Sequence, residues 1–358
     1  MGETERIAQL LAPYLGSALE RLRLLAEGWE TIIFEFATRS ASVRLPSSAA
    51  CRPLILRFYR GGGAVLKAAR EFSVIERLKS ARFAVPAPYL VETDPAPLGA
   101  PFMVMERLQG GPLFRTDNFP LAFKTFSLAF LAFVRAQARL HRLAPEAIAQ
   151  GPGCGFVVSP RLPASMPLIE RALATLAERI ESGALSGMRE ALAALSERAP
   201  KFRAAAAVPV HLDYHPRNVI VRGLSVTGVI DWCNADLGDR HFDAAMSSVI
   251  LATSVFESPR WMRDNAAGNS LRRLFTALYL PLYHALAGLE LERLRFYQGL
   301  AAMLRLSMLA TMRLGGSESL GFRAQAVDEV SPSLLRVLAR YARKKTGAPL
   351  TLPAMPAD

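Results

Sequence analysis

The feature that most constrains the fold is a change in sequence texture near Gly110-Gly111-Pro112. Before this point, short β-like runs alternate with one clear helical pattern, whereas beyond it apolar residues recur mostly at helical spacing. The chain of 358 residues is also long for a single hydrophobic core, and 51% of its residues are apolar. We therefore predict an α+β protein of two lobes, residues 1–110 and 111–347, with a loose tail over 348–358.

The N-terminal part is typical of a small antiparallel sheet with one main helix. The first two strands of such a sheet would form a hairpin, joined through a turn over Gly28 to Thr31. In chain order, we expect a helix over 4–19, strands over Arg21–Ala26, Ile32–Thr38 and Leu54–Tyr59, a helix over Ala64–Ser80, and strands over Tyr89–Val91 and Phe102–Met105.

The C-terminal part is larger and mainly helical. Its one clear strand is Val226–Ile230, which ends on Asp231. We expect helices over 121–143, 164–182, 186–200, 241–254, 266–289, 291–313 and 324–344.

Composition excludes several classes of protein. No apolar stretch reaches the roughly 18 uninterrupted residues of a transmembrane helix, and the N-terminus lacks a signal-peptide pattern, so we expect a cytoplasmic protein without a membrane partner. Three distant cysteines argue against a disulfide framework or a zinc clip. The net charge of +12 is spread along the chain, which argues against a nucleic-acid partner, because such surfaces normally form a basic stripe.

One short stretch, Val210 to Val221, concentrates polar groups between two apolar runs. His211, Asp213 and Asn218 follow H-x-D-x-x-x-x-N, and Asp231 ends a strand shortly afterwards. This arrangement resembles that of protein-kinase-like phosphotransferases. Hard Mg²⁺ prefers oxygen ligands, which Asn218 and Asp231 would supply, and Asp213 is placed to orient an acceptor hydroxyl and to take its proton.

The N-terminal part contains candidates for the other components of such a site. The hairpin with Gly28 and Thr31 would cover the nucleotide phosphates, Arg57 on the third strand would reach the α and β phosphates, and Glu71 on the helix would pair with Arg57. Protein kinases have lysine where this chain has Arg57. A guanidinium keeps the charge and changes the geometry of the contact.

Together these residues resemble the aminoglycoside phosphotransferase / choline kinase-like family of small-molecule kinases over nearly the whole chain. The family's "HGDxHxxN" is similar to "HLDYHPRN" here, its "IDW" and "GD…D" to "IDW" and "GDRHFD", and its hinge to "PFMVMERLQG". The resemblance implies a bilobal protein-kinase-like fold, with ATP and Mg²⁺ as cofactors. It also implies that backbone groups of Glu106 and Leu108 hold adenine, with Met105 beside the pocket.

The chain departs from the family pattern at two positions, where Leu212 replaces a glycine and Cys233 follows the Asp-Trp pair. We expect Leu212 to keep a backbone angle that is ordinary for L-residues. His211 and His215 are interpreted as braces of the loop, and Asp239 and Asp243 as structural caps or anchors.

Other functions remain open at this point. A metal-dependent hydrolase could use His211, Asp213, His215 and Asp231, and a nucleotide-binding protein without catalysis is a further alternative. The acceptor is a small hydroxylated molecule whose identity the sequence leaves open. Because residues 111–210 carry only 7 acidic side chains, a neutral or anionic acceptor is favoured, although the apolar helices leave a hydrophobic one open.

Overall fold

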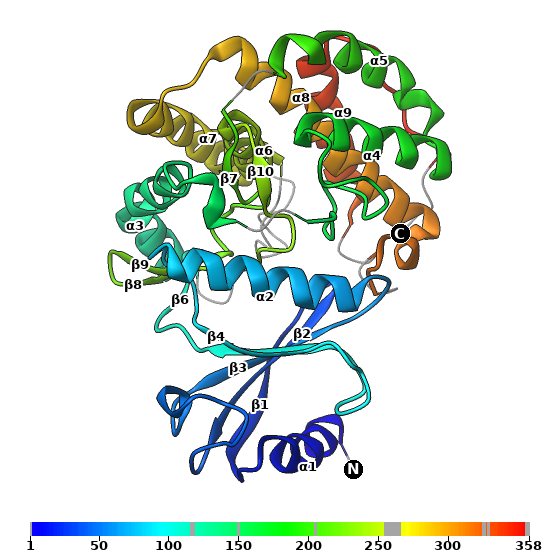
Figure 1. The fold of residues 1–358 in the computed structure, drawn as a ribbon. Helices are drawn as coiled ribbons and strands as arrows, with labels where there is room; N and C mark the ends of the chain where they lie inside the picture. The colour runs from blue at the N-terminus through cyan, green and yellow to red at the C-terminus, as the bar shows by residue number, and fades with distance from the viewer. Residues whose placement is uncertain are drawn as a thin grey trace.

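Five antiparallel strands in the order β1-β2-β3-β5-β4 form the sheet of the N-terminal lobe, and most of the helices form a second lobe above it (Figure 1). We describe a computed structural model over residues 2–114, 119–148, 151–203, 206–253, 266–323, 327 and 330–354. The strands are β1 Leu19–Glu27, β2 Thr31–Thr38, β3 Leu54–Tyr59, β4 Pro88–Glu92 and β5 Phe102–Glu106. The predicted α+β, two-lobed architecture is confirmed.

Alternation along β3 decides which side chains face the second lobe. Leu54, Leu56 and Phe58 pack in the core that includes α1 (Glu3–Leu15), whereas Ile55 and Tyr59 pack on the opposite face with α2 (Ala64–Ser80). Successive side chains of a strand point to opposite faces, so Arg57 shares the face of Ile55 and Tyr59. The strand thus carries one buried cation toward α2 and the second lobe.

Helix α2 lies across the waist of the molecule, between the sheet and the C-terminal lobe (Figure 1). Its buried apolar residues Val74, Ile75 and Leu78 share one core with residues of both lobes. Lys67 and Glu71 extend the same stripe toward the helix N-terminus at intervals of three or four residues. The stripe therefore brings charged groups as well as apolar ones against the second lobe.

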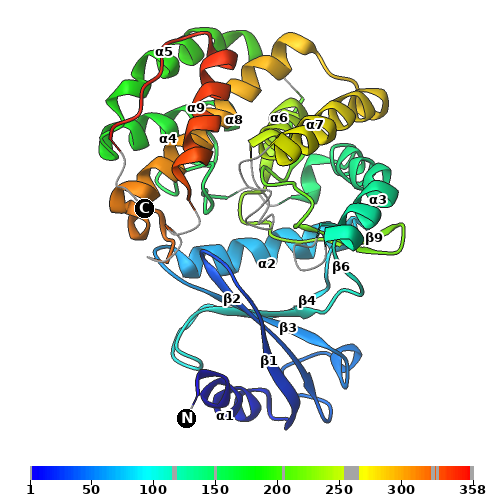
Figure 2. The ribbon, with the colours of Figure 1, turned by 180° about the vertical axis from the view of Figure 1, so that it is seen from behind.

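The C-terminal lobe packs around α8, most of whose residues are buried. A helix that is buried on all sides is usually apolar around its circumference. The buried part of α8 nevertheless carries the polar residues Gln298, Arg305, Ser307 and Thr311. The helices of this lobe are α3 Phe119–Leu140, α4 Leu168–Ser182, α5 Arg189–Arg198, α6 Arg240–Thr253, α7 Ala266–Ala287, α8 Leu291–Thr311 and α9 Pro332–Thr346, and Figure 2 shows α4, α5, α8 and α9 together from behind.

Short strands hold the loops between the lobes. β7 (Val208–Val210) pairs with β10 (Asp236–Gly238), and β8 (Val219–Arg222) lies between β6 (Gly111–Pro112) and β9 (Ser225–Val229). The predicted H-x-D-x-x-x-x-N segment is the loop from β7 to β8. Short 3₁₀ turns lie at Ser47–Ala49, Pro145–Ala147, Ser186–Met188, Ala199–Phe202 and Glu318–Leu320, and a π-helical turn at Met312–Gly316.

Several boundaries differ from expectation. The first helix ends at Leu15 rather than at 19, and the helix predicted from 164 begins at Leu168. The last helix begins at Pro332 rather than at 324. The hydroxyl of Ser331 caps it by accepting a hydrogen bond from the Leu334 amide. Residues 324–326, 328 and 329 lie outside the described residues. The tail is held rather than loose over 348–354, since Leu350 is buried and the Thr351 amide donates to Gly187. Residues 355–358 lie outside the description.

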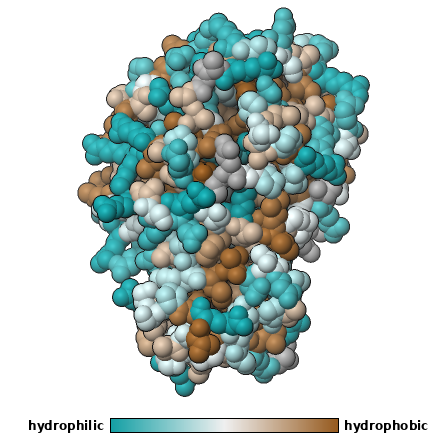
Figure 3. Space-filling model, in the orientation of Figure 1, coloured by the Kyte–Doolittle hydropathy of each residue, from teal (hydrophilic) through white to brown (hydrophobic). Residues whose placement is uncertain are grey.

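Polar residues cover much of the face shown in Figure 3, and hydrophobic residues gather near the waist between the lobes. Over the described residues, no helix is both long enough and apolar enough to cross a membrane.

Candidate active site

The loop between β7 and β8 is braced by a buried histidine. Nε2 of His211 lies 3.0 Å from the carbonyl oxygen of Ile230, and its Nδ1 accepts a hydrogen bond of 3.3 Å from the Asp213 amide. Burial lowers the pKa of His211, in keeping with a neutral ring that donates through one nitrogen and accepts through the other. The ring ties the loop to the strand end that carries Asp231.

Leu212 adopts a left-handed backbone angle, φ +61°, so the expectation of an ordinary angle was wrong. Two contacts hold it there: its side chain is fully buried in the C-terminal core, and its amide donates to Asp243 Oδ1 at 2.6 Å. The other carboxylate oxygen of Asp243, Oδ2, lies 2.8 Å from Nε2 of His141 and accepts a hydrogen bond of 3.0 Å from Nε2 of Gln137. The buried carboxylate anchors the loop, which is the structural role that the sequence suggested.

Asp213 has a mostly buried carboxylate. The side-chain nitrogen Nδ2 of Asn218 donates to the backbone carbonyl oxygen of Asp213 at 3.0 Å. Nη1 of Arg305 and Nε2 of His215 each lie 3.8 Å from the Asp213 carboxylate. Burial raises the pKa of Asp213 to about 7, against the lowering effect of Arg305. A carboxylate with such a pKa can accept a proton near neutral pH.

Asp231 faces the N-terminal lobe across the cleft. Its Oδ1 lies 2.8 Å from Nη2 of Arg57, whose Nε is 3.4 Å from Glu71 Oε2. Glu71 also accepts from the Tyr59 hydroxyl at 2.7 Å and from the Trp232 amide at 3.2 Å. Burial alone would raise the pKa of Asp231, but the Arg57 guanidinium outweighs this effect and holds the pKa below its usual value. One strand, one helix and one loop thus meet at a single arginine.

The oxygen atoms of Asn218 and Asp231 fit a hard cation. Because the side-chain nitrogen Nδ2 of Asn218 donates to the Asp213 carbonyl, the side-chain oxygen Oδ1 is the atom of Asn218 that could bind a metal, and the Asp231 carboxylate is only partly buried. These are the ligand types that Mg²⁺ prefers. Within the described residues, Glu71, Asp231 and Cys233 also group their ligand atoms within 4.8 Å, but there the guanidinium of Arg57 already balances the charge.

The two histidines are poorly placed for the alternative metal site. Both ring nitrogens of His211 are engaged by the backbone of Ile230 and Asp213, and Nδ1 of His215 accepts from the Arg217 amide at 3.2 Å. A metal ligand needs a ring nitrogen with a lone pair directed at the ion. The geometry therefore supports the interpretation of these side chains as braces.

The β1–β2 hairpin closes over the cleft. The Gly28 amide donates to the Thr31 carbonyl at 2.8 Å, which shapes the turn that both residues were predicted to form. Glu30, between them, forms an ion pair of 3.1 Å with the buried Lys67 of α2. Sequence reasoning missed this pair, although Lys67 lies on the buried stripe of α2 together with Glu71.

A second contact joins the hairpin tip to the C-terminal lobe. The rings of Trp29 and Phe322 meet edge to face with centroids 5.6 Å apart, and the Arg323 amide donates to the Trp29 carbonyl at 2.9 Å. The turn is thus fixed to both lobes at the mouth of the cleft.

The hinge segment uses some of its backbone groups within the fold. The Glu106 amide donates to the Ala87 carbonyl at 2.8 Å, and the Leu108 carbonyl accepts from Arg107. Within the described part of the chain, the Glu106 carbonyl and the Leu108 amide have no backbone partner outside the regular elements, and these two groups could bind a ligand. Met105 is buried beside them in the core shared by the two lobes.

Comparisons with known proteins identify the family. The sequence model of the phosphotransferase enzyme family matches residues 37–289, well over half of the chain. The chain belongs to this family. No curated protein matches the chain. The predicted family resemblance and enzyme class are thereby confirmed, and the protein is a small-molecule kinase by family.

Solved structures confirm the fold of this phosphotransferase. A candidate aminoglycoside phosphotransferase from Ralstonia eutropha JMP134 is 19% identical, with a TM-score of 0.62 over 94% of this chain and 98% of its own. A thermostable mutant of aminoglycoside phosphotransferase APH(4)-Ia in a ternary complex with AMP-PNP and hygromycin B is 20% identical, with a TM-score of 0.60 over 95% and 98%. Amicoumacin kinase hAmiN with AMP-PNP, Ca²⁺ and Ami is 16% identical, with a TM-score of 0.56 over 96% and 94%.

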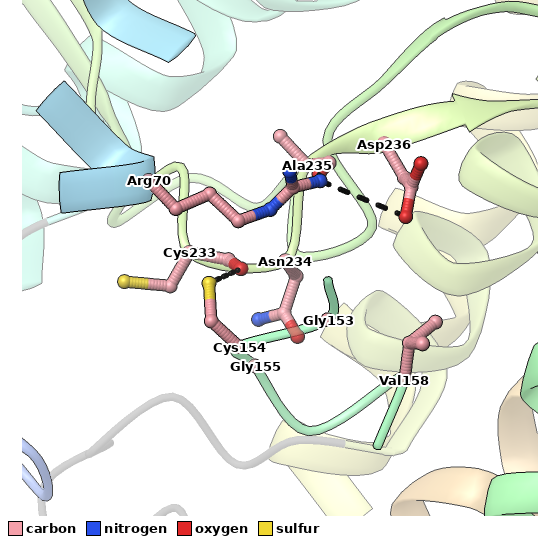
Figure 4. A pocket seen from close by; sticks show the side chains of 9 residues that line it. All are labelled: Arg70, Gly153, Cys154, Gly155, Val158, Cys233, Asn234, Ala235 and Asp236. Carbon is pink, nitrogen blue, oxygen red and sulfur yellow. Dashed lines mark hydrogen bonds and ion pairs between the residues drawn. The ribbon is translucent and has the colours of Figure 1, made fainter. Parts of the chain in front are cut away.

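A buried arginine that sequence reasoning missed ties α2 of this phosphotransferase to the segment after Asp231. Arg70 donates to the Ala235 carbonyl at 2.8 Å and lies 3.7 Å from Asp236, which Arg171 of α4 approaches at 2.9 Å (Figure 4). The cavity beside them measures about 10 Å³, which is room for one water molecule at most. This cluster therefore has a structural role rather than a ligand-binding one.

Proposed function

We propose that this phosphotransferase moves the γ-phosphoryl group of ATP to a hydroxyl of a small molecule, with Mg²⁺ as the metal and Asp213 as the catalytic base. The observation that carries the proposal is that the segments of Asp213, Asn218 and Asp231 are joined: Nδ2 of Asn218 donates to the Asp213 carbonyl at 3.0 Å, and the Ile230 amide, next to Asp231, donates to the Asn218 carbonyl at 2.9 Å. Arg57 of the N-terminal lobe lies 2.8 Å from Asp231. The related structures that contain AMP-PNP support an adenine nucleotide as the donor.

Each residue in the cleft then has a defined task. Asp213 orients the acceptor hydroxyl and takes its proton, an effect of typically ~10²–10⁴-fold for a positioned general base. The oxygens of Asn218 and Asp231 would hold the metal, which, when bound, neutralises charge on the phosphate oxygens. Arg57 would grip the α and β phosphates, held in place by Glu71.

The remaining residues position the nucleotide. The Glu106 carbonyl and the Leu108 amide would bind adenine, with Met105 against the ring. The hairpin turn between Gly28 and Thr31 would cover the phosphates.

Replacing Asp213 by Asn tests the proposal. Asp213→Asn should lower ATP-dependent phosphorylation of an acceptor, found by screening hydroxylated metabolites and antibiotics, by at least ~10²-fold. Binding of Mg·AMP-PNP, measured by calorimetry, should persist. The exposed Asp94→Asn serves as the control, because it removes a carboxylate far from the loop. Turnover by Asp213→Asn at the wild-type rate would refute the assignment.

A further inference from the structure

Two connections join the lobes at opposite ends of α2. Near its C-terminal end the chain passes through the hinge, where Lys79 of the last helical turn lies 3.4 Å from Glu106. At its N-terminal end, Gly61 lies against Gly321 of the C-terminal lobe. Figures 1 and 2 show β6 beside one end of α2 and the orange segment that follows α8 beside the other. Since α2 has 17 residues that rise about 1.5 Å each, the two connections are roughly 25 Å apart.

The contact at the N-terminal end of α2 joins backbone atoms that can meet only because the residues are glycines. Gly61 and Gly321 both have left-handed φ angles, +77° and +78°. A Cβ atom on Gly61 would lie 2.3 Å from the carbonyl oxygen of Gly321, and one on Gly321 would lie 2.8 Å from that of Gly62. Cβ atoms do not approach a backbone oxygen so closely. A side chain at either glycine would therefore push the two lobes apart.

Side chains extend this contact to the turn at the tip of β1 and β2. Phe322 is 5% exposed, and its ring meets that of Trp29 edge to face with centroids 5.6 Å apart. The Arg323 amide donates to the Trp29 carbonyl at 2.9 Å, and Nη1 of Arg323 lies 3.6 Å from Oε1 of Glu27. Residues 321–323 thus connect the C-terminal lobe to the turn that was predicted to cover the nucleotide phosphates.

The lobes also meet at the proposed nucleotide site. Nη2 of Arg57 on β3 lies 2.8 Å from Oδ1 of Asp231 in the C-terminal lobe. The proposed function places phosphate groups on Arg57 and the metal on Asp231, and both cannot fit between two atoms that are already in contact. These two side chains must therefore separate when a nucleotide binds.

We propose that residues 321–323 form a latch that holds the lobes together and is released when a nucleotide enters or leaves. The inference rests on the proposed function. Because Arg57 is buried and Glu71 holds it at 3.4 Å, it moves together with β3 and α2. Release of the latch lets this end of α2 move away from Asp231 while the hinge holds the other end. Gly321 and Phe322 are positioning residues, which act on the nucleotide through the turn and α2.

The latch predicts a change in both rate constants of nucleotide binding. Weakening it populates the open arrangement, so association should become faster, and it destabilises the closed complex, so dissociation should become faster as well. An edge-to-face aromatic pair such as Trp29 and Phe322 changes an equilibrium by about 2- to 10-fold. Each rate constant should rise within that range, and the affinity, which is their ratio, should change less than either.

Two pairs of glycines provide matched variants. Gly61→Ala and Gly321→Ala should raise both rate constants, measured by stopped flow with Mg²⁺ and mant-ADP, because each new Cβ meets the backbone of the other lobe. Gly63→Ala and Gly315→Ala are the controls. Their φ angles are +80° and +89°, so they carry a similar conformational penalty, but nothing lies within 4 Å of the new Cβ. Equal changes in all four variants would mean that backbone strain, and not the latch, sets the rates.

The aromatic pair supplies a second set of variants in case the glycine variants do not fold. Trp29→Ala and Phe322→Leu each remove one ring, and both should raise the two rate constants. Trp29→Phe keeps a ring at this position and should restore most of the wild-type behaviour. Faster dissociation together with slower association would overturn the latch, because the contact would then help to form the nucleotide site instead of restricting access to it.

Hydrogen exchange tests the latch without a nucleotide. In Gly321→Ala, the amides of residues 27–31 should exchange about 2- to 10-fold faster together with those of 321–323, since the two segments hold each other. In Gly315→Ala, the exchange of residues 27–31 should stay at the wild-type rate. Unchanged exchange of residues 27–31 in Gly321→Ala would contradict the latch.

The outcomes separate this inference from the proposed function. Faster nucleotide exchange in the latch variants, with no phosphoryl transfer to any acceptor, would support the latch and refute the proposed function alone. Phosphoryl transfer with wild-type nucleotide rate constants in Gly61→Ala, Gly321→Ala and Trp29→Ala would refute the latch alone.

Discussion

The two sides of the cleft balance their charges differently. On the side formed by β3 and α2, here called the nucleotide wall, Arg57 lies between Glu71 and Asp231, and Lys67 pairs with Glu30. Every one of these cations meets a carboxylate within 3.4 Å. The desolvation of such buried pairs can cost as much as their attraction gains, but removal of one partner leaves an uncompensated buried charge and is strongly destabilising.

The opposite side, formed by the loop from β7 to β8 and by α8, is here called the catalytic floor. It leaves charge poorly paired, and it shares a left-handed backbone angle with Asp231, whose φ is +68°. Leu212 has φ +61°, burial raises the pKa of Asp213 to about 7, and Arg305 stands off from that carboxylate at 3.8 Å. Strained backbone and poorly solvated charge cluster where a protein performs chemistry. The comparison suggests that the wall stabilises the fold, while the floor is held in place at a cost to stability.

Breaking the wall should have the largest effect. Arg57→Met leaves Glu71 buried without its cation, and removing one partner of a buried ion pair costs about 3–5 kcal/mol. The free energy of unfolding from urea denaturation measures this loss. Arg57→Lys keeps the charge and should recover most of the stability. A loss below about 1 kcal/mol for Arg57→Met would show that the wall does not carry the stability assigned to it.

The wall could be predicted largely from the sequence, because its pattern is local. Strand alternation places Arg57 on the face of α2, and helical spacing places Lys67 and Glu71 on one stripe. The H-x-D-x-x-x-x-N loop is likewise contained in a few residues. Such periodicities fix the direction of a side chain without knowledge of the rest of the fold.

The loop residues of the floor, Asp213 and Asn218, could be predicted, but the contacts that hold the loop could not, since distant segments determine them. The left-handed backbone angle of Leu212 is held by a hydrogen bond from its amide to the carboxylate of Asp243, 31 positions away. The steric rule for isolated residues therefore gave the wrong angle. Arg305 reaches Asp213 from a helix near the other end of the chain, with no motif to mark it.

Neutralising the floor should stabilise the protein, unlike breaking the wall. Burial raises the pKa of Asp213 from 3.8 to about 7, so the folded state binds a proton that the unfolded state has released. The stability that this group contributes is therefore present below pH 3.8 and is lost as the pH rises to about 7. At pH 8, the free energy of unfolding of Asp213→Asn should exceed that of the wild type by up to about 4 kcal/mol, since the shift is about three pKa units and each unit is worth about 1.4 kcal/mol.

Chemical denaturation in EDTA at several pH values measures this gain in the metal-free protein. The gain should shrink toward pH 4, and the exposed Asp94→Asn should show no such trend. A destabilised Asp213→Asn at pH 8 would mean that the attraction of Arg305 outweighs the cost of burial, and the floor would then resemble the wall.

The smallest effect concerns the backbone of the floor. Both Leu212→Ala and Leu212→Gly remove a buried side chain, at a cost of about 2–5 kcal/mol. Glycine adopts a positive φ without the penalty of roughly 1–2 kcal/mol that other residues pay. That relief offsets the conformational entropy of glycine and the loss of one methyl group, so the glycine variant should be at least as stable as the alanine variant.

Leu304, fully buried within α8, provides the matched comparison for Leu212. There the backbone is helical, and glycine should be about 1 kcal/mol less stable than alanine. Urea denaturation of the four variants gives the two alanine-to-glycine differences, and their separation isolates the backbone strain at Leu212 from the loss of packing. If glycine were as unfavourable relative to alanine at Leu212 as at Leu304, the left-handed angle would carry no strain. The floor would then differ from the wall in charge alone.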